Sequence, residues 1–185
     1  MDSEDDLALG RREGLPDALR ALLEAYPRDS WEAHPGFGGL VEFWLERHLM
    51  FRKLCAMLRE DAEGAVDGRL APETQQGRLA RYGTMLVNEL HGHHQIEDHH
   101  YFPALSGLEP QLVRGFTLLD GDHHAMDGLL DRFAKAGNAV LQGQGEVGPF
   151  REEVLSFEAM LDRHLVDEEE LIVPVILKHG AGGLQ

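Results

Sequence analysis

Cysteine is almost absent from this sequence, since Cys55 is the only one among 185 residues. A single thiol cannot close an intrachain disulfide, so nothing in the chain calls for an oxidising compartment. No apolar run approaches the ~20 residues that a membrane-spanning helix needs. The first six residues, MDSEDD, are acidic, whereas a secretion signal begins with basic residues. These absences predict a soluble protein of the reducing cytoplasm with no membrane partner.

Positive charge is also scarce. The chain has 17 lysine and arginine residues against 33 aspartate and glutamate residues, which gives a formal net charge of −16. Nucleic-acid binding rests mainly on cationic side chains that neutralise phosphates, so no nucleic-acid partner is expected. The acidic balance suits a protein that attracts cations, although acidity alone also serves solubility. The length and the apolar content of 43% fit one globular domain with a full core.

Histidine is abundant in one place: five of the eleven histidines fall within residues 91–100. His93 and Glu97 are four residues apart, so on a helix they project from one face as a pair of metal ligands would. The spacing returns near the end of the chain, where Glu168 follows His164 by four. A proline follows each glutamate by six residues, so His-x-x-x-Glu-x5-Pro occurs twice.

The repeat extends towards the N-terminus of each half. His48 lies 45 residues before His93, and His123 lies 41 residues before His164, each among apolar residues at helical spacing. Each half therefore reads as a helical hairpin that carries one histidine and then a His-x-x-x-Glu pair. Two such hairpins would direct four histidines and two carboxylates into one bundle.

Apolar residues at helical spacing predict four long helices. Their expected bounds are about 39–63, 72–102, 111–136 and 149–177, with a glycine-rich connection at 137–148. Pro103 is expected to end the second helix, and Pro174 to kink or shorten the fourth. The fold class predicted is all-α, an up-down-up-down antiparallel four-helix bundle with a short N-terminal helix.

The segment before the bundle is expected to hold a charged, frayed tail (1–14), a short helix (15–26) and a loop (27–39). The domain organisation predicted is an acidic tail, short helix and loop at 1–36, the bundle at 37–180 and a tail at 181–185. In this arrangement His48, His93, His123 and His164 each lie roughly 10 to 13 residues from the same end of the bundle, or about 15 to 20 Å.

A set of four imidazoles and two carboxylates is a mixed nitrogen and oxygen shell. It suits iron, manganese or zinc and is too rich in nitrogen for calcium or magnesium. Six protein ligands are too many for one tetrahedral zinc ion, so two metal ions that share carboxylates are expected, with coordination positions open to a small molecule.

The register leaves neighbouring residues as alternatives. His94 competes with His93, His124 with His123, and Asp98 with Glu97; the repeated spacing favours the residues within the repeat. The other histidines have no repeat partner and are expected at the surface or, like His100 with Tyr101, in hydrogen bonds to ligands. Cys55 is expected to be buried and inert.

These motifs resemble the hemerythrin family, in the broader hemerythrin-like (HHE cation-binding) group. The resemblance covers about residues 39–178, and its strongest parts are HHQIED with Phe102-Pro103, and HLVDEEE before Pro174. It implies an up-and-down four-helix bundle around a non-haem centre of two iron ions per chain that share carboxylates. Whether an oxo bridge also joins the two ions is an open alternative. Carried over position by position, the ligand places fall on His48, His93, Glu97, His123, His164 and Glu168.

The chain departs from the pattern of oxygen-carrying hemerythrins at two places. Those proteins have a second histidine one turn after the third-helix histidine, where this chain has Asp127. They also have His-x-x-x-x-Asp on the last helix, where this chain has Glu168 four residues and Glu169 five residues after His164. The resemblance thus implies a di-iron protein that binds, senses or reacts with oxygen, peroxide or nitric oxide. An oxidoreductase acting on peroxide or nitric oxide is one form of this hypothesis. The alternative is an iron-buffering or regulatory module that acts through a partner protein.

Overall fold

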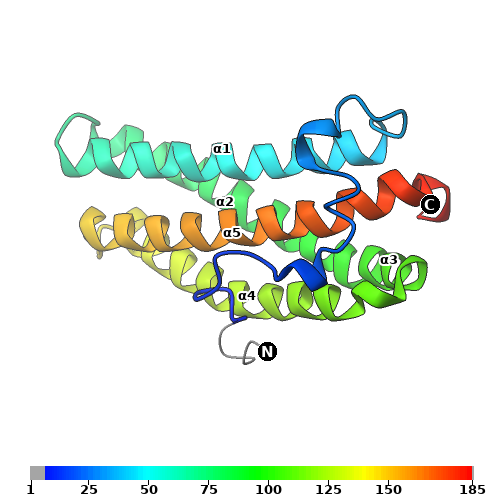
Figure 1. The fold of residues 1–185 in the computed structure, drawn as a ribbon. Coiled ribbons are helices and arrows are strands. Elements are labelled where there is room, and N and C mark those ends of the chain that lie inside the picture. Colours follow the sequence, from blue (N-terminus) through cyan, green and yellow to red (C-terminus); the bar gives the residue numbers. More distant parts are fainter. Residues whose placement is uncertain (1–6, 185) are drawn as a thin grey trace. The chain divides into compact units, whose positions relative to one another are not determined.

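The computed structural model describes residues 7–184, and every regular element among them is helical (Figure 1). The four long helices are α1 (Leu40–Val66), α2 (Pro72–Ile96), α4 (Val113–Leu141) and α5 (Val147–His179). They pack antiparallel, which confirms the predicted all-α four-helix bundle. Within the described residues, none of the helices combines the length and the apolarity needed to cross a membrane.

Short elements complete the chain. They are the 3-10 turns η1 (Asp17–Leu19), η2 (Arg28–Ser30), η4 (Pro110–Leu112) and η5 (Ala181–Gly183), the π-helical turn η3 (Glu97–Tyr101) and the short helix α3 (Phe102–Leu108). The predicted helix at 15–26 is shorter than expected, because η1 is the one helical turn that the structure gives this segment. Pro16 precedes η1, and the Leu19 N–H bonds to the Pro16 carbonyl and the Arg20 N–H to the Asp17 carbonyl.

The predicted frayed tail is wrong in its described part. Leu7, Leu9 and Arg12 are all buried, so residues 7–14 are packed against the fold. The acidic stretch 1–6 lies outside the described residues, as does Gln185 at the other end.

Pro103 does not end the second helical segment, contrary to the prediction. The π-helical turn η3 follows α2 directly, and the Phe102 N–H closes it by bonding to the Glu97 carbonyl five residues back. Pro103 then stands in the first turn of α3, where a missing N–H is tolerated. Single π-helical turns within helices often occur at functional sites, and this one begins at Glu97.

Pro174 does not shorten α5, which continues to His179. Residues 171–177 are all buried, so apolar packing offsets the backbone hydrogen bond that the proline removes. The expected 137–148 connection is shorter than predicted, since α4 runs through Gly137 to Leu141. Gly143, with a φ of 67°, makes the turn instead.

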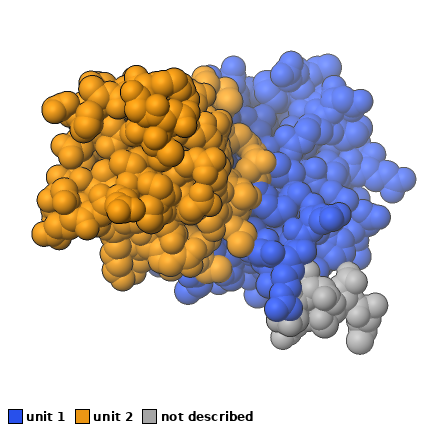
Figure 2. All heavy atoms as spheres, turned by 90° about the vertical axis from the view of Figure 1, so that its left-hand side faces the viewer, with its two compact units in different colours: residues 1–48, 94–124, 163–185 blue, residues 49–93, 125–162 orange. Residues whose placement is uncertain are grey.

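The chain forms two compact units, shown in Figure 2 in blue and orange. Unit 1 consists of residues 1–48, 94–124 and 163–185, and unit 2 of residues 49–93 and 125–162. Each unit contains a segment of each long helix of the bundle. In unit 1 the buried apolar residues include Trp31, Trp44 and Phe116 and the C-terminal part of α5, which together form one core.

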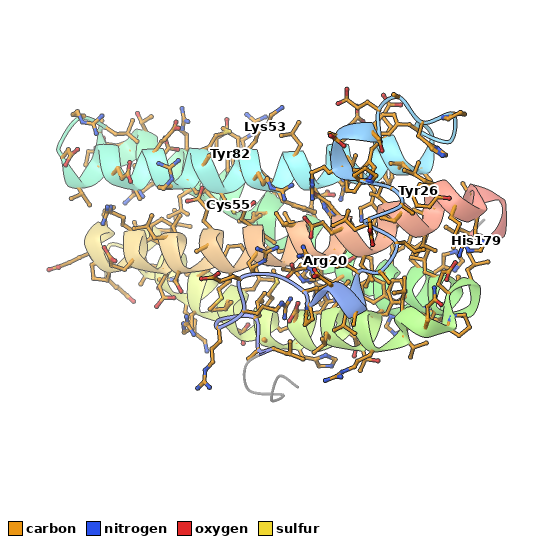
Figure 3. The ribbon with its side chains drawn as sticks, viewed as in Figure 1. Arg20, Tyr26, Lys53, Cys55, Tyr82 and His179 are labelled. Carbon is orange, nitrogen blue, oxygen red and sulfur yellow. The ribbon has the colours of Figure 1, made fainter. Side chains whose placement is uncertain are left out.

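Unit 2 has an aromatic core in which the Phe133 ring lies 5.6 Å from Phe150 and 5.8 Å from Phe157. Cys55, labelled in Figure 3, is buried there, and burial, with Glu158 and Asp162 nearby, raises the pKa of its thiol to about 12. The predicted burial of Cys55 is confirmed, and a thiol with so high a pKa is a poor nucleophile.

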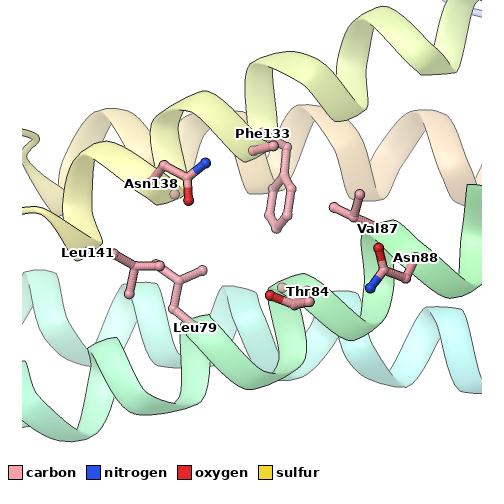
Figure 4. A pocket seen from close by; sticks show the side chains of 10 residues that line it. Leu79, Thr84, Val87, Asn88, Phe133, Asn138 and Leu141 are labelled. Carbon is pink, nitrogen blue, oxygen red and sulfur yellow. The ribbon is translucent and has the colours of Figure 1, made fainter.

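Unit 2 also contains a pocket of about 160 Å³ between α2 and α4, drawn in Figure 4. Leu79, Val87, Phe133 and Leu141 line it, and the polar groups at its rim include the amides of Asn88 and Asn138. None of its lining residues is ionisable, so the pocket offers no metal-ligand set of the kind that the sequence predicts.

Glu109, just after α3, ties that end of unit 1 to the last turn of α5. Its buried carboxylate accepts a hydrogen bond from Lys178 Nζ and lies 2.6 Å from His179 Nε2. The Lys178 hydrogen bond, followed by that of His179, lowers the pKa of Glu109 below its ordinary value. A carboxylate with a lowered pKa in the folded state contributes stability above its unfolded pKa and loses it as the pH falls.

We therefore expect Glu109→Gln to lower the free energy of unfolding at neutral pH by on the order of 1 kcal/mol. The difference from the wild type should shrink as the pH falls through about 4.5 and below, where the wild-type carboxylate becomes protonated. Denaturant unfolding of the metal-free proteins across this pH range measures it. A difference that stays constant with pH would contradict the assignment.

Candidate metal centre

Three histidines of unit 1 are buried and held in the same way. Each ring presents Nδ1 to a carboxylate: His48 to Glu169 at 3.0 Å, His123 to Asp98 at 2.7 Å and His164 to Asp122 at 3.3 Å. A carboxylate beside Nδ1 keeps the ring proton on that nitrogen, and so leaves the Nε2 lone pair for a metal ion. The three rings are therefore arranged as metal-ligating histidines usually are.

Two of these rings bring their Nε2 atoms close together. His123 Nε2 and His164 Nε2 lie 3.1 Å apart. Two nitrogens that each bind an ion at about 2.1 Å lie about 3 Å apart when the angle at the metal is near 90°. The two rings are thus already spaced as ligands of one ion.

Two carboxylates are buried among these nitrogens. Glu168 is fully buried, with Oε1 3.6 Å from His48 Nε2 and Oε2 3.3 Å from His164 Nε2. Its two oxygens therefore face two different histidines. Glu97 Oε2 lies 3.6 Å from His123 Nε2. Such placement suits carboxylates that bridge two cations.

Two neighbouring groups of donors result, each with ligand atoms within 4.8 Å of one another. One group is His94, His123 and His164; the other is His48, His93, Glu97 and Glu168. The His94 ring stacks on His123, with centroids 3.9 Å apart and planes within 9°. Each group supplies at least three side chains, as a bound transition metal requires.

The electrostatics of the metal-free site favour protons where cations would bind. Burial raises the pKa of Glu97 well above its ordinary value, and the charge of Glu168 raises it further. Burial lowers the pKa of His164, but its hydrogen bonds to Asp122 and Glu168 outweigh this and raise the pKa to about 9. Burial also opposes the charged form of His48, yet the Glu168 and Glu169 carboxylates raise its pKa. A bound cation would displace these protons.

Trp44, on α1, fixes the orientation of Glu168. Its indole N–H donates a hydrogen bond of 2.7 Å to Glu168 Oε1, and its ring packs edge-on against Tyr101, with centroids 4.6 Å apart. Both aromatic side chains belong to or pack against the unit 1 core, so this side of Glu168 is dry. Hydrogen bonding of this kind restricts how a carboxylate can present its oxygens to a metal.

Arginines from the N-terminal segment neutralise the carboxylates that surround the histidines. Arg12 is buried and bonds to both Asp122 and Asp167, while Arg28 bonds to Glu169. Burial opposes the charge on Arg12, but its hydrogen bonds and charge pairs, first with Asp122, raise its pKa. The hydrogen bonds from Arg12 and His164 outweigh burial and lower the pKa of Asp122.

The six residues that the sequence predicted as ligands are distributed over these two candidate groups; they are His48, His93, Glu97, His123, His164 and Glu168. The structure also adds His94, which the sequence treated as a competitor of His93. His124 is 75% exposed and bonds to the Asp120 carbonyl, so α4 presents His123 to the site instead. Asp127 is exposed as well.

The sequence reasoning missed the carboxylates that hold the rings. Asp98 and Glu169 each directly follow a predicted ligand glutamate. An acidic residue therefore occurs at the same place in both copies of the repeat, and this signal could have revealed them. Asp122 directly precedes His123 but serves His164, a contact that no local spacing predicts. Arg12 and Arg28 have no counterpart in the repeat.

Buried imidazoles and carboxylates within an antiparallel four-helix bundle define a class of metal-binding helical proteins. Comparison with known families agrees: the Hemerythrin HHE cation binding domain matches residues 39–176. The chain therefore belongs to that family, as its motifs had suggested. No curated protein and no solved structure matches the chain.

Replacing Glu97 tests the balance between buried charge and bound cation. Without metal, Glu97 carries the cost of burial beside Glu168, so Glu97→Gln should stabilise the metal-free protein at neutral pH by on the order of 1 kcal/mol, or about 2–4 °C in Tm. Because the pKa of Glu97 is raised, this gain should shrink as the pH falls and the wild-type carboxyl takes up a proton.

With metal present the sign should reverse, since Glu97→Gln removes a ligand and with it the rise in Tm that a bound cation gives. Thermal unfolding with and without added Fe²⁺, in the absence of air, measures both effects. The exposed Asp127→Asn is the control, and its Tm should stay near that of the wild type in both conditions. A metal-free Glu97→Gln protein less stable than the wild type would contradict this account.

Proposed function

We propose that this protein binds two iron ions through the two donor groups and that the resulting centre binds, senses or reacts with oxygen, peroxide or nitric oxide. The observation that carries the proposal is the position of Glu168, whose two oxygens face histidines of different groups. A carboxylate placed in this way suits a pair of ions better than a single one.

Iron is favoured by the chemistry of the donors. The two groups supply imidazoles and carboxylates and contain no thiolate, a combination that suits iron, manganese or zinc. The surplus of nitrogen disfavours calcium and magnesium, which prefer oxygen ligands. Membership of a cation-binding family supports a metal at this place.

The residues leave room for a small ligand. Five imidazoles and two carboxylates supply at most nine donor atoms, whereas two six-coordinate ions accept about twelve ligand atoms. Bound iron would supply Lewis acidity and redox chemistry at the remaining positions. The protein's part is to hold the donors in place and, through Trp44 and the apolar core around it, to exclude bulk water.

Metal analysis tests the proposal directly. We expect protein prepared with Fe²⁺ in the absence of air, then passed through a desalting column, to retain about two iron ions per chain. Exposure to air or to nitric oxide should then change its absorption spectrum. Protein that retains no iron would refute the proposal, and an unchanged spectrum would remove its oxygen and nitric oxide chemistry.

Two adjacent histidines provide a matched pair of variants. His123→Gln should lower the retained iron, because it removes an Nε2 ligand and the partner of Asp98. His124→Gln changes the next residue, which is exposed, and should keep the wild-type iron content. Equal iron content in the two variants would mean that α4 does not contribute to the centre as proposed.

A further inference from the structure

Residues 7–31, here called the N-terminal strap, precede the part of the chain that the family matches. The strap has little regular structure, yet its buried side chains include Leu7, Leu15 and Trp31. Of the four arginines in the strap, three stand at intervals of eight residues, Arg12, Arg20 and Arg28. Each of these three pairs with an acidic residue of α5 within residues 167–170.

Arg12 reaches His164 through one carboxylate. Its two terminal nitrogens bond to the two oxygens of Asp122, and its Nε donates to Asp167 Oδ2 at 2.7 Å. Asp122 Oδ2 in turn lies 3.3 Å from His164 Nδ1. The planar guanidinium thus fixes the plane of the carboxylate that faces the ring.

Arg28 stands in the same relation to His48. It donates a hydrogen bond of 2.7 Å to Glu169 Oε2, and Glu169 Oε1 lies 3.0 Å from His48 Nδ1. The guanidinium itself is held over the ring of Trp31, 4.7 Å from the centroid. Trp31 is buried and donates its indole N–H to the Tyr26 carbonyl, so the strap itself holds the ring on which this arginine packs.

We propose that Arg12 and Arg28 are positioning residues of the metal centre: they anchor Asp122 and Glu169, which in turn hold His164 and His48 with Nε2 directed to the metal. This inference rests on the proposed function. It makes the strap part of the centre, so that full metal affinity requires the strap to be docked. Partners that orient a ligating histidine typically change metal affinity by about 10–100-fold when they are removed.

Arg20 is the matched control on the same strap. It bonds to Glu170 Oε2 at 2.6 Å, and its side chain is 29% exposed, against 45% for Arg28. Within the described residues, Glu170 is paired with Arg20 and has no hydrogen bond or ion pair with a histidine (Arg20 is labelled in Figure 3). Arg20→Gln therefore removes a comparable ion pair between the strap and α5 without changing a carboxylate that holds a histidine.

The experiment compares Arg28→Gln with Arg20→Gln. Binding of Fe²⁺ is measured without air, by competition with a chromophoric iron(II) chelator. Arg28→Gln should weaken binding roughly tenfold, and Arg20→Gln less than about twofold. Equal affinities in the two variants would overturn the proposal, since a merely structural strap would lose as much from either ion pair.

Lysine variants separate the two positioning arginines. Arg28 uses a single nitrogen on Glu169, so Arg28→Lys should restore most of the affinity. Arg12 uses all three guanidinium nitrogens, so Arg12→Lys should not. The Arg28 series decides the question if Arg12→Gln fails to fold, because Arg28 is half exposed. Failure of Arg28→Lys to recover the iron affinity would count against the positioning role of Arg28.

A metal-free readout separates this proposal from the proposed function. In protein labelled with ¹⁵N-histidine, the His48 Nδ1–H signal should be present in the wild type and in Arg20→Gln, and be lost or exchange-broadened in Arg28→Gln. Wild-type protein that binds no iron would refute the proposed function only. An Arg28→Gln protein that keeps the His48 signal would overturn the positioning role, whatever the wild type binds.

Discussion

Four consecutive acidic residues on α5, Asp167 to Glu170, impose the constraint on which the rest of the structure depends. Successive helical residues are turned by about 100°, so these four side chains point to nearly every side of the helix. Asp167, Glu168 and Glu169 are nonetheless buried. Buried carboxylates need cations or hydrogen-bond donors on each side, and one helix face cannot supply them all.

The protein meets this constraint with two different kinds of partner. Glu168 points inward to the imidazoles and to the Trp44 indole, where a metal ion would complete the charge balance. The other three acids face arginines of the N-terminal strap, over sequence separations of 141 to 155 residues. The strap thus lies on the outer side of the same turn of α5 that directs Glu168 to the candidate metal site.

The fold and the members of the two candidate donor groups could be predicted because they are periodic or repeated. Apolar periodicity gave the four helices, and the doubled His-x-x-x-Glu gave Glu97 and Glu168 at their places. The π-helical turn at Glu97 could not be predicted, since the local sequence suggested only that Pro103 ends a helix. The strap could not be predicted either, because Arg12 and Arg28 occur once and their partners are far away in the sequence.

The repeat also explains how the rings are held, and where its symmetry ends. Asp98, after the glutamate of the first half, faces His123 of the second half; Glu169, after the glutamate of the second half, faces His48 of the first. The two contacts are equivalent under the repeat. Asp122, which faces His164, has Arg47 at the equivalent position, since each directly precedes a ligand histidine of its half. An acid in one half therefore corresponds to a base in the other.

This asymmetry has a chemical consequence for the two donor groups. The group of His94, His123 and His164 consists of neutral ligands, while the other contains both carboxylates. Two cations bound by these groups would be surrounded by different negative charge. The cation of the three-histidine group would receive negative charge from this chain only through a carboxylate shared with the other group. The carboxylates Asp98 and Asp122 lie behind two of its imidazoles and make those rings stronger donors. Arg12 draws charge from Asp122 and so weakens this effect on His164. The strap therefore acts on the group of neutral ligands through His164, and on the group that contains both carboxylates through His48.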